Sequence, residues 1–449
     1  MIKHVYVKNL EQLSDEINKG EPLMFVGSRT STVIPYDTFT ESEVGSITKL
    51  VDTSLLKKEI VIKETPKEVI LVISGGVSWL DLKIFCAEND LFPLTSPTEE
   101  NALVLSGIAT SATGERCFGF GTLRDQVRRI KYMNFKGEIK SLDSDKAFES
   151  DINLSIFNKY KQDYQSRFKL FKNGPFPRFE KETDLMIGTE GQLGVITEAE
   201  VVVKKKVDNC FIFVQLDKWE SNYDLHLEIL NWVQGKRDRI YACEILDSNS
   251  LSVLPEDESP IDSRDVDLIF LEVSINDMED IFECLVSDLP SIDENKVFSM
   301  DASRCQRLRL SVPRYTFERN SQMGVLKKGT DVQVSKECFS NLLDLYRDFS
   351  KVGISYNLFG HFGDCHLHFN FFPKKNEEPS CDELLKSFYQ EVKKLSGSPF
   401  AEHGIGLFKQ KFIKDFYESF HYEVFELLKK KYDPDNIFFP SGFMSMSRK

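Results

Sequence analysis

The feature that most constrains the fold is residues 183–203, where three glycines lie three residues apart between a short apolar run and a predicted strand. They are Gly188, Gly191 and Gly194. Glycine can adopt positive φ and lets the backbone, with its N–H groups, approach a ligand closely. From Val195 onward the odd positions are mostly apolar, with acidic residues between them, which predicts a strand. The spacing alone favours a hairpin with two tight turns, and a ligand-binding loop is the alternative.

The composition excludes several classes of protein. The chain has 449 residues, which is long enough for two domains, and its 41% hydrophobic content with 36 Phe indicates large packed cores. The count of 57 Lys and Arg against 71 Asp and Glu gives a formal charge of −14, which argues against binding of nucleic acid. The nine cysteines are odd in number and form no C-x-x-C pair, so we expect reduced thiols and neither an iron–sulfur nor a zinc-ribbon module.

The chain shows no membrane or export signal. Its first residues lack a basic segment followed by an apolar one, so no secretory leader is expected. It has no run of about 18 apolar residues, so no transmembrane segment is expected. We therefore expect a cytoplasmic protein, with peripheral attachment to the inner membrane as an alternative.

The pattern of predicted elements changes near Lys206, after which strands alternate with helices, and we place a domain boundary there. Before it, a buried strand at 69–73 leads to a helix that Ser78 caps. Beyond it, the expected elements are strands at 210–216, 240–246 and 268–273 and helices at about 221–234 and 278–286. These two strand–helix–strand rounds predict an α+β domain whose antiparallel sheet carries helices on one face. Residues 140–182 have no assigned role.

Histidines are concentrated in one stretch, because four of the seven lie between 361 and 403. In the strand predicted after His361, residues His366, His368 and Asn370 share one face. Glu402 and His403 place a carboxylate beside another imidazole. Two or three imidazoles and a carboxylate suit a divalent metal, and a further histidine suits a general base. A satisfied polar core is the alternative interpretation.

The string Asp184-Leu-Met-Ile-Gly-Thr-Glu-Gly-Gln-Leu-Gly-Val-Ile-Thr-Glu-Ala199 closely resembles the flavin-binding loop of the vanillyl-alcohol oxidase superfamily. Within it, the chain is similar to FAD-linked 2-hydroxy-acid oxidases and dehydrogenases of the glycolate oxidase large-subunit and D-lactate dehydrogenase type. The resemblance covers about the whole chain. It implies an α+β fold with a two-part FAD-binding domain of small mixed sheets at 1–206. A cap domain with an antiparallel sheet follows at 207–398, and a segment at 399–449 returns to the FAD domain.

The resemblance also implies which residues contact FAD, although several motifs are diluted. The implied positions are Gly27, Thr30, Ser31, Ala109, Thr110, Gly114, Gly121, Thr122, Gly188, Glu190, Gly191, Gly194, Val195 and Ile196. Arg29 stands where the family has a glycine, and Leu105-Ser106 replaces a glycine pair. Ser111 replaces an asparagine.

For the reacting end of the site, the resemblance implies His361, His368 and Glu402 as metal ligands, His403 as the base and Arg314 as the substrate-carboxylate group. Zinc or manganese is the candidate metal. Cys365 and His366 replace the usual Gly-Asn pair, and His366 is a candidate substitute ligand. The family's Lys-x-Asp is shifted to Lys328–Asp331, which leaves a lysine contact unassigned.

The implied function is oxidation of a small D-2-hydroxy acid, such as lactate, glycolate or 2-hydroxyglutarate, by hydride transfer to flavin N5. The diluted glycine loops support an alternative, a flavin-binding or flavinless subunit of a multi-component oxidase. A third hypothesis, the superfamily's transferase chemistry on a lipid precursor, has no supporting motif. No Gly-x-Gly-x-x-G occurs, so NAD is not expected; quinone, cytochrome, electron-transfer flavoprotein and oxygen are the candidate electron acceptors. A homodimer is a candidate assembly.

Overall fold

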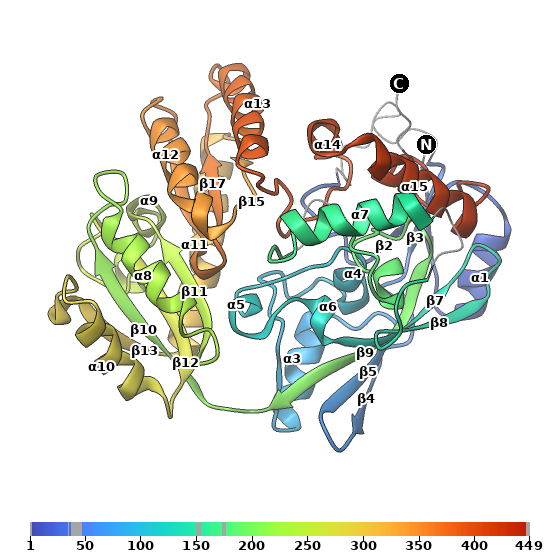
Figure 1. Ribbon diagram of the computed structural model, residues 1–449, viewed down its shortest axis with the longest axis horizontal. Coiled ribbons are helices and arrows are strands. Elements are labelled where there is room, and N and C mark those ends of the chain that lie inside the picture. Colours follow the sequence, from blue (N-terminus) through green and yellow to red (C-terminus); the bar gives the residue numbers. More distant parts are fainter. Residues whose placement is uncertain (1, 35, 37–46, 150–153, 173–176, 446–449) are drawn as a thin grey trace. The chain divides into compact units, whose positions relative to one another are not determined.

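The computed structural model describes residues 2–34, 36, 47–149, 154–172 and 177–445 and divides the chain into two compact units (Figure 1). The first unit combines residues 1–114, 121–206 and 402–449. The second combines residues 115–120 with 207–401. The predicted boundaries lie after residues 206 and 398, and the units divide after 206 and 401. No helix in the described part of the chain is long and apolar enough to span a bilayer.

A parallel three-stranded sheet begins the first unit. Its order is β1 (Lys3–Tyr6), β3 (Lys49–Asp52), β2 (Leu23–Val26), and α1 (Leu10–Asn18) connects the first two strands in sequence. Asn9 begins α1 by accepting a hydrogen bond from the N–H of Gln12. Leu13 and Ile17 of α1 pack with Ile437 and Phe438, so the end of the chain completes this core.

The second sheet of the first unit is antiparallel and six-stranded. It contains β4 (Glu59–Glu64), β5 (Val69–Ser74), β9 (Val195–Lys205), β7 (Val127–Met133) and β8 (Ile139–Asp143) in this order, and β6 (Leu91–Pro93) also pairs with β9. The helix after β5, α3 (Trp79–Glu88), begins at a capping box of Ser78 and Asp81, as predicted for Ser78. The glycine-rich stretch ends at Gly194 and β9 begins at Val195, so the central strand of the sheet fixes the position of the last residues of this stretch.

The remaining elements of the first unit are helices and 3-10 turns, and the last three belong to the C-terminal segment. They are α4 (Val104–Ala109), α6 (Leu123–Gln126), α7 (Leu154–Arg167), η1 (Glu182–Leu185), α14 (Gln410–Phe416), α15 (Ser419–Tyr432) and η6 (Phe443–Ser445). On α15, the buried Lys429 donates from Nζ to the carbonyl oxygens of Gln192 (3.0 Å) and Phe438 (2.7 Å). The side chain of Lys429 thus ties α15 to the glycine-rich stretch.

The second unit is built on an antiparallel eight-stranded sheet. Its order is β13 (Val297–Asp301), β10 (Asn209–Leu216), β12 (Asp267–Ser274), β11 (Ile240–Leu246), β16 (Tyr356–His361), β17 (His366–Phe371) and β14 (Lys328–Gly329), and β15 (Val332–Gln333) also pairs with β17. Its helices are α5 (Cys117–Phe120), α8 (Asp224–Gln234), α9 (Ser248–Ser252), α10 (Met278–Asp288), α11 (Ala302–Met323), α12 (Phe339–Ser350) and α13 (Glu378–Lys394). Four short 3-10 turns complete it: η2 (Glu256–Glu258), η3 (Glu294–Lys296), η4 (Lys336–Cys338) and η5 (Phe362–Asp364).

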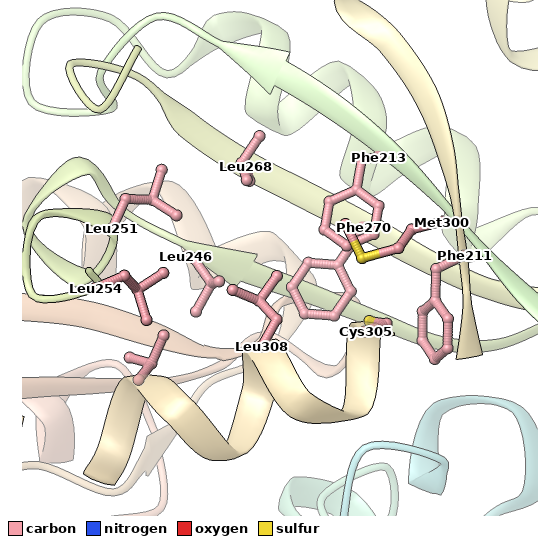
Figure 2. Close-up of a cluster of buried hydrophobic side chains, with 11 residues drawn as sticks. Phe211, Phe213, Leu246, Leu251, Leu254, Leu268, Phe270, Met300, Cys305 and Leu308 are labelled. Atoms are coloured by element: carbon pink, nitrogen blue, oxygen red, sulfur yellow. The ribbon is translucent and has the colours of Figure 1, made fainter. Parts of the chain in front are cut away.

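This sheet is covered on both faces, so the expectation of helices on one face is wrong. Figure 2 shows Leu308 and Cys305 of α11 against Phe213 and Phe270, which belong to one face. The alternate residues of the same strands are also buried, and all eight residues of β12 lie in the core. The sequence of α11 hid this packing, because its arginines dilute the apolar face that Cys305, Leu308 and Val312 form.

A buried pair of carboxyl groups lies at the start of α9. Asp247 begins this helix and accepts from the N–H of Ser250 at 2.7 Å, while Asp267 accepts from the N–H of Ser248 at 3.0 Å. Both aspartates are fully buried. Burial, followed by the charge of Asp267, raises the pKa of Asp247 to about 8.

This carboxyl pair predicts a pH-dependent stability. Because the pKa of Asp247 is about 8 in the fold against about 3.9 in an unfolded chain, the folded state holds the proton more tightly, and the free energy of unfolding falls as pH rises through this window. Asn cannot ionise and still begins a helix well, so Asp247→Asn removes that part of the pH dependence. Urea unfolding at pH 5 to 8.5 measures it. Parallel pH profiles for the variant and the parent protein would contradict this assignment.

Candidate functional site

Four loop segments of the first unit converge on one place, which we call the loop cluster: residues 27–33, 105–114, 188–194 and 402–407. The N–H of Glu190 donates to the carbonyl of Ala109 at 2.9 Å, and the N–H of Leu407 donates to that of Val33 at 2.9 Å. A Cβ on Gly27 would lie 2.7 Å from Oγ of Ser106, so these segments also touch. The structure therefore brings together the glycine-rich stretch, the two diluted loops at 27–33 and 105–114, and the segment that carries Glu402 and His403.

The carboxylate of Glu190 joins the glycine-rich stretch to the segment that carries Glu402 and His403. It accepts from the N–H of Ile405 at 2.6 Å and of Gly406 at 3.0 Å. Glu190 has φ 53° and Gly404 φ 78°, and a Cβ on Gly404 would lie 2.7 Å from Glu190 Oε1. Burial raises the pKa of Glu190 to about 7, against the lowering effect of the two N–H donors. The carboxylate predicted to contact FAD thus also holds the segment that follows Glu402 and His403.

The substituted positions keep the backbone geometry that glycine or asparagine provides in the family. Arg29 has φ 55° and Ser111 has φ 53°, both in the left-handed region. The guanidinium of Arg29 turns to the sheet, where Nη2 donates to Tyr6 Oη at 2.8 Å and lies 3.6 Å from Asp52. Arg29 therefore has the backbone conformation expected for the family's glycine, and its side chain contacts the sheet instead of the loop.

The residues of the loop cluster fit a bound FAD. The hydroxyl of Thr113 is buried and has no hydrogen-bond partner among the described residues, as expected for a group that faces a ligand. A Cβ on Gly114 would lie 2.4 Å from the carbonyl oxygen of Ser96, so the chain has room only for glycine at this turn. These loops offer backbone amides at close approach, which is what a pyrophosphate requires.

Other predicted cofactor residues have structural contacts of their own. Thr122 begins α6 in a capping box with Asp125, directly after Gly121 at φ 75°. Gly194 packs against Tyr132, since a Cβ there would lie 2.6 Å from Cδ2 of the ring. The other positions lie as follows: Thr30 and Ser31 after β2, Thr110 directly after α4, Gly188 and Gly191 in left-handed turns, and Val195 and Ile196 buried at the start of β9.

In the second unit, three buried histidines form what we call the histidine cluster: His361, His366 and His368. His361 ends β16, and the other two lie in β17, which pairs with β16 in a hairpin. Ring centroids lie 5.1 Å apart for His361 and His366 and 4.7 Å for His366 and His368. One potential ligand atom of each residue lies within 4.8 Å of the others, so the three can share a cation.

Each ring of the cluster is held by an oxygen acceptor. His361 Nδ1 lies 2.8 Å from Glu244 Oε1, and His368 Nδ1 lies 3.2 Å from the carbonyl oxygen of Thr330. His366 Nε2 lies 3.0 Å from Asp331 Oδ1. Such acceptors orient metal-binding imidazoles, so the cluster fits a divalent cation.

Sequence reasoning did not assign these acceptor roles. Glu244 is a buried carboxylate inside the apolar strand β11, and an acidic residue in an otherwise apolar strand could have indicated a functional role from the sequence. Asp331 carried no such signal.

Cys365 takes the place of a glycine and keeps its conformation, with φ 55°. Its side chain is 2% exposed, and burial raises the pKa of the thiol. The preceding Asp364 is paired with Arg237 at 3.0 Å. Cys365 is therefore a structural residue of the turn between the histidines.

The remaining predicted residues lie apart from these contacts. Arg314, on α11, donates from Nη2 to Glu258 at 3.1 Å and lies over the ring of Tyr315. Its side chain is 53% exposed, and the contacts described for it are with Glu258 and Tyr315 rather than with the histidine cluster. Glu402 and His403 open the last segment of the first unit, directly after Ala401.

Comparison with known families gives two matches along the chain. The profile described as "FAD binding domain" matches residues 4–143, and the profile described as "FAD linked oxidases, C-terminal domain" matches residues 233–441. Together they span both units.

Curated relatives are distant but cover most of the chain. A D-2-hydroxyglutarate–pyruvate transhydrogenase of Saccharomyces cerevisiae is 24% identical, over 82% of this chain and 72% of its own length. A D-2-hydroxyglutarate dehydrogenase of Stutzerimonas stutzeri is also 24% identical, over 82% and 76%. A mitochondrial D-lactate dehydrogenase (cytochrome) of Kluyveromyces lactis is 22% identical, over 90% and 66%.

Among solved structures, an alkyldihydroxyacetonephosphate synthase superposes with a TM-score of 0.68 at 15% identity, covering 98% of this chain and 76% of the synthase. At this identity the likeness concerns the fold alone.

The Glu190 bridge predicts a specific loss. Glu190→Ala removes the acceptor of two backbone N–H groups in the loop cluster, which we expect to cost about 1–3 kcal/mol in the free energy of unfolding. Glu190→Gln keeps an acceptor oxygen and is the matched control, expected to lose less. Thermal unfolding and the FAD content of each purified variant measure the effect. Equal losses for the two variants would contradict the role of the carboxylate oxygen as acceptor.

Proposed function

We propose, starting from the fact that this chain belongs to the FAD-linked oxidases, that it oxidises a small D-2-hydroxy acid to the corresponding 2-oxo acid. The names of its relatives, which are D-2-hydroxyglutarate and D-lactate dehydrogenases and a D-2-hydroxyglutarate–pyruvate transhydrogenase, support this substrate class. The structural observation that carries the proposal is the histidine cluster, with an oxygen acceptor on every ring. A flavin-binding subunit without turnover has no need for such an arrangement.

Each reactive group has a separate task in this proposal. Bound FAD supplies the oxidising power by accepting a hydride from the α-carbon. His361, His368 and Glu402 would hold a divalent cation, which polarises the hydroxyl and carboxylate oxygens of the substrate. His403 takes the hydroxyl proton, and Arg314 binds the substrate carboxylate in a two-pronged pair.

The contacts of Arg314 are compatible with that task. Its pair with Glu258 is largely exposed, and exposed pairs of this kind contribute about 0–1 kcal/mol. Glu258 also accepts from Ser311 and Tyr315, so it keeps hydrogen-bond donors when Arg314 leaves. A substrate carboxylate can therefore replace Glu258 at small cost.

Anaerobic addition of substrates to the FAD-loaded protein tests the proposal. We expect the flavin absorbance to bleach with at least one of D-lactate, glycolate and D-2-hydroxyglutarate, with the L-enantiomers as matched controls. A bound flavin that dithionite reduces but that none of these acids reduces would overturn the substrate class. Adding oxygen, a quinone analogue, cytochrome c or an electron-transfer flavoprotein to the reduced protein then identifies the electron acceptor.

His403 should matter for proton removal only. We expect His403→Ala to retain FAD and to slow flavin reduction by about 10²–10⁴-fold, the usual contribution of a general base. The exposed His4 on β1 provides a control, since His4→Ala should reduce its flavin at the parent rate. Rapid-mixing spectroscopy measures both rates, and an unchanged rate in His403→Ala would remove this residue from the mechanism.

Arg314 should matter for substrate binding. Arg314→Ala is expected to raise the substrate concentration for half-maximal reduction about 10–100-fold, as for loss of a charged hydrogen bond. Glu258→Gln removes the competing charge and should leave that concentration at or below the parent value. The assignment fails if both variants bind substrate as the parent protein does.

A further inference from the structure

We propose that His366 is a third imidazole ligand of the cation held by His361 and His368, positioned by Asp331, and that the site therefore selects Zn²⁺ over Mn²⁺. This inference rests on the metal site of the proposed function and adds a residue and a metal preference to it.

The first argument is the placement of His366 within the cluster. It is 0% exposed, and the centre of its ring lies 5.1 Å from that of His361 and 4.7 Å from that of His368. The rings of His361 and His368 are themselves 5.9 Å apart. The three rings thus form a triangle, and one ligand atom of each lies within 4.8 Å of the others, so a cation bound by His361 and His368 is within reach of a nitrogen of His366.

The second argument is the orientation of the three rings. A nitrogen that faces an oxygen acceptor carries the proton of a neutral imidazole, which leaves the lone pair on the opposite nitrogen. The acceptors at His361 and His368 therefore assign the lone pairs to Nε2, and Asp331 assigns that of His366 to Nδ1. Each of the three histidines thus has one nitrogen at an oxygen acceptor and a second nitrogen as a candidate ligand atom, by the same kind of outer contact.

The residues that lead into one short strand, β15, provide the oxygen acceptors of two of the three rings. β15 pairs with β17 through Gln333 and His366, and the two residues that precede β15 are Thr330 and Asp331. Thr330 holds His368 through its carbonyl oxygen, and Asp331 holds His366 through its carboxylate. His366 is therefore built into the site in the same way as His368, by neighbouring residues of one segment.

The third argument is charge. Glu244 and Asp331 are 6% and 1% exposed, and each faces an imidazole of the cluster. Buried carboxylates require a positive partner. The charge of Lys327 already acts on Asp331, and a divalent cation at the histidine cluster would add positive charge near both carboxylates.

The metal preference follows from the donor atoms. Imidazole nitrogen suits Zn²⁺, whereas Mn²⁺ prefers carboxylate, carbonyl and water oxygens. A third nitrogen donor shifts the site toward Zn²⁺. His366→Asn should therefore weaken binding of Zn²⁺ more than binding of Mn²⁺.

Competition between the two metals tests this. Chelator-treated, FAD-loaded full-length protein is dialysed against equal Zn²⁺ and Mn²⁺, and both metals are counted by mass spectrometry. We expect the parent protein to hold Zn²⁺ predominantly and His366→Asn to lower its Zn²⁺ to Mn²⁺ ratio at least about 10-fold. Asp331→Asn, which keeps the ligand but alters its outer partner, should weaken Zn²⁺ affinity by about 10–100-fold.

A matched control separates metal binding from folding. His226 pairs through Nε2 with Asp267 at 3.1 Å and is also buried, but it belongs to no candidate cation cluster of the described residues. His226→Asn removes the same kind of pair and should leave metal content unchanged. Thermal unfolding of each variant without metal reports folding, and the absorbance of Co²⁺-loaded protein reports a change of ligand directly.

The outcomes separate this inference from the proposed function. An unchanged metal ratio and Co²⁺ spectrum in His366→Asn would overturn the inference, as would a parent protein that holds neither metal. Flavin reduction by hydroxy acids is read separately. A protein that binds Zn²⁺ through His366 but oxidises no hydroxy acid would keep this inference and remove the proposed substrate class.

Discussion

The hydrogen bonds of Glu190 connect two parts of the chain that are 215 and 216 residues apart, and the geometry of the loop cluster depends on them. The same residue donates from its backbone N–H to Ala109, so a single glutamate contacts two other segments of the cluster. Its own left-handed conformation and that of Gly404 allow the approach. A carboxylate in this position orders the backbone directly after His403.

The conformations of the diluted motifs are also maintained. Arg29, Ser111 and Cys365 stand where the family has glycine or asparagine, and all three have φ between 53° and 55°. A non-glycine residue in this region costs of order 1 kcal/mol, and it persists only where the surroundings enforce it. These three residues therefore adopt the turn conformation that glycine or asparagine favours, as a cofactor-binding protein with the family's loops requires.

Much of the fold could be predicted from local patterns. The strand at 69–73, the cap at Ser78 and the strand after Gly194 all appear at the expected places, because each depends on residues within one or two turns of the chain. The covering of the second sheet by α11 was not predictable in this way, since three core residues on a helix with many arginines leave a weak periodicity. The conformation of Arg29 was equally hidden, because an arginine there gives no local signal for positive φ.

The candidate site shows the same division between local and long-range information. Clustering of histidines in sequence predicted the members of the cluster, because His361, His366 and His368 belong to one hairpin. Their acceptors come from elsewhere: Glu244 from β11 and Asp331 from the residue before β15. Partners at sequence separations of 117 and 35 residues follow from strand pairing, which no local pattern encodes. The pairing of Arg314 with Glu258 is also long-range.

The central claim is that the altered loops still hold FAD. Its most direct measurement is the visible spectrum of the purified protein before and after incubation with FAD and removal of the excess. The account predicts a flavin spectrum with one FAD for each chain, because the left-handed turns at Arg29 and Ser111 and the bridge from Glu190 are intact. A folded protein that stays colourless after incubation with FAD would contradict it.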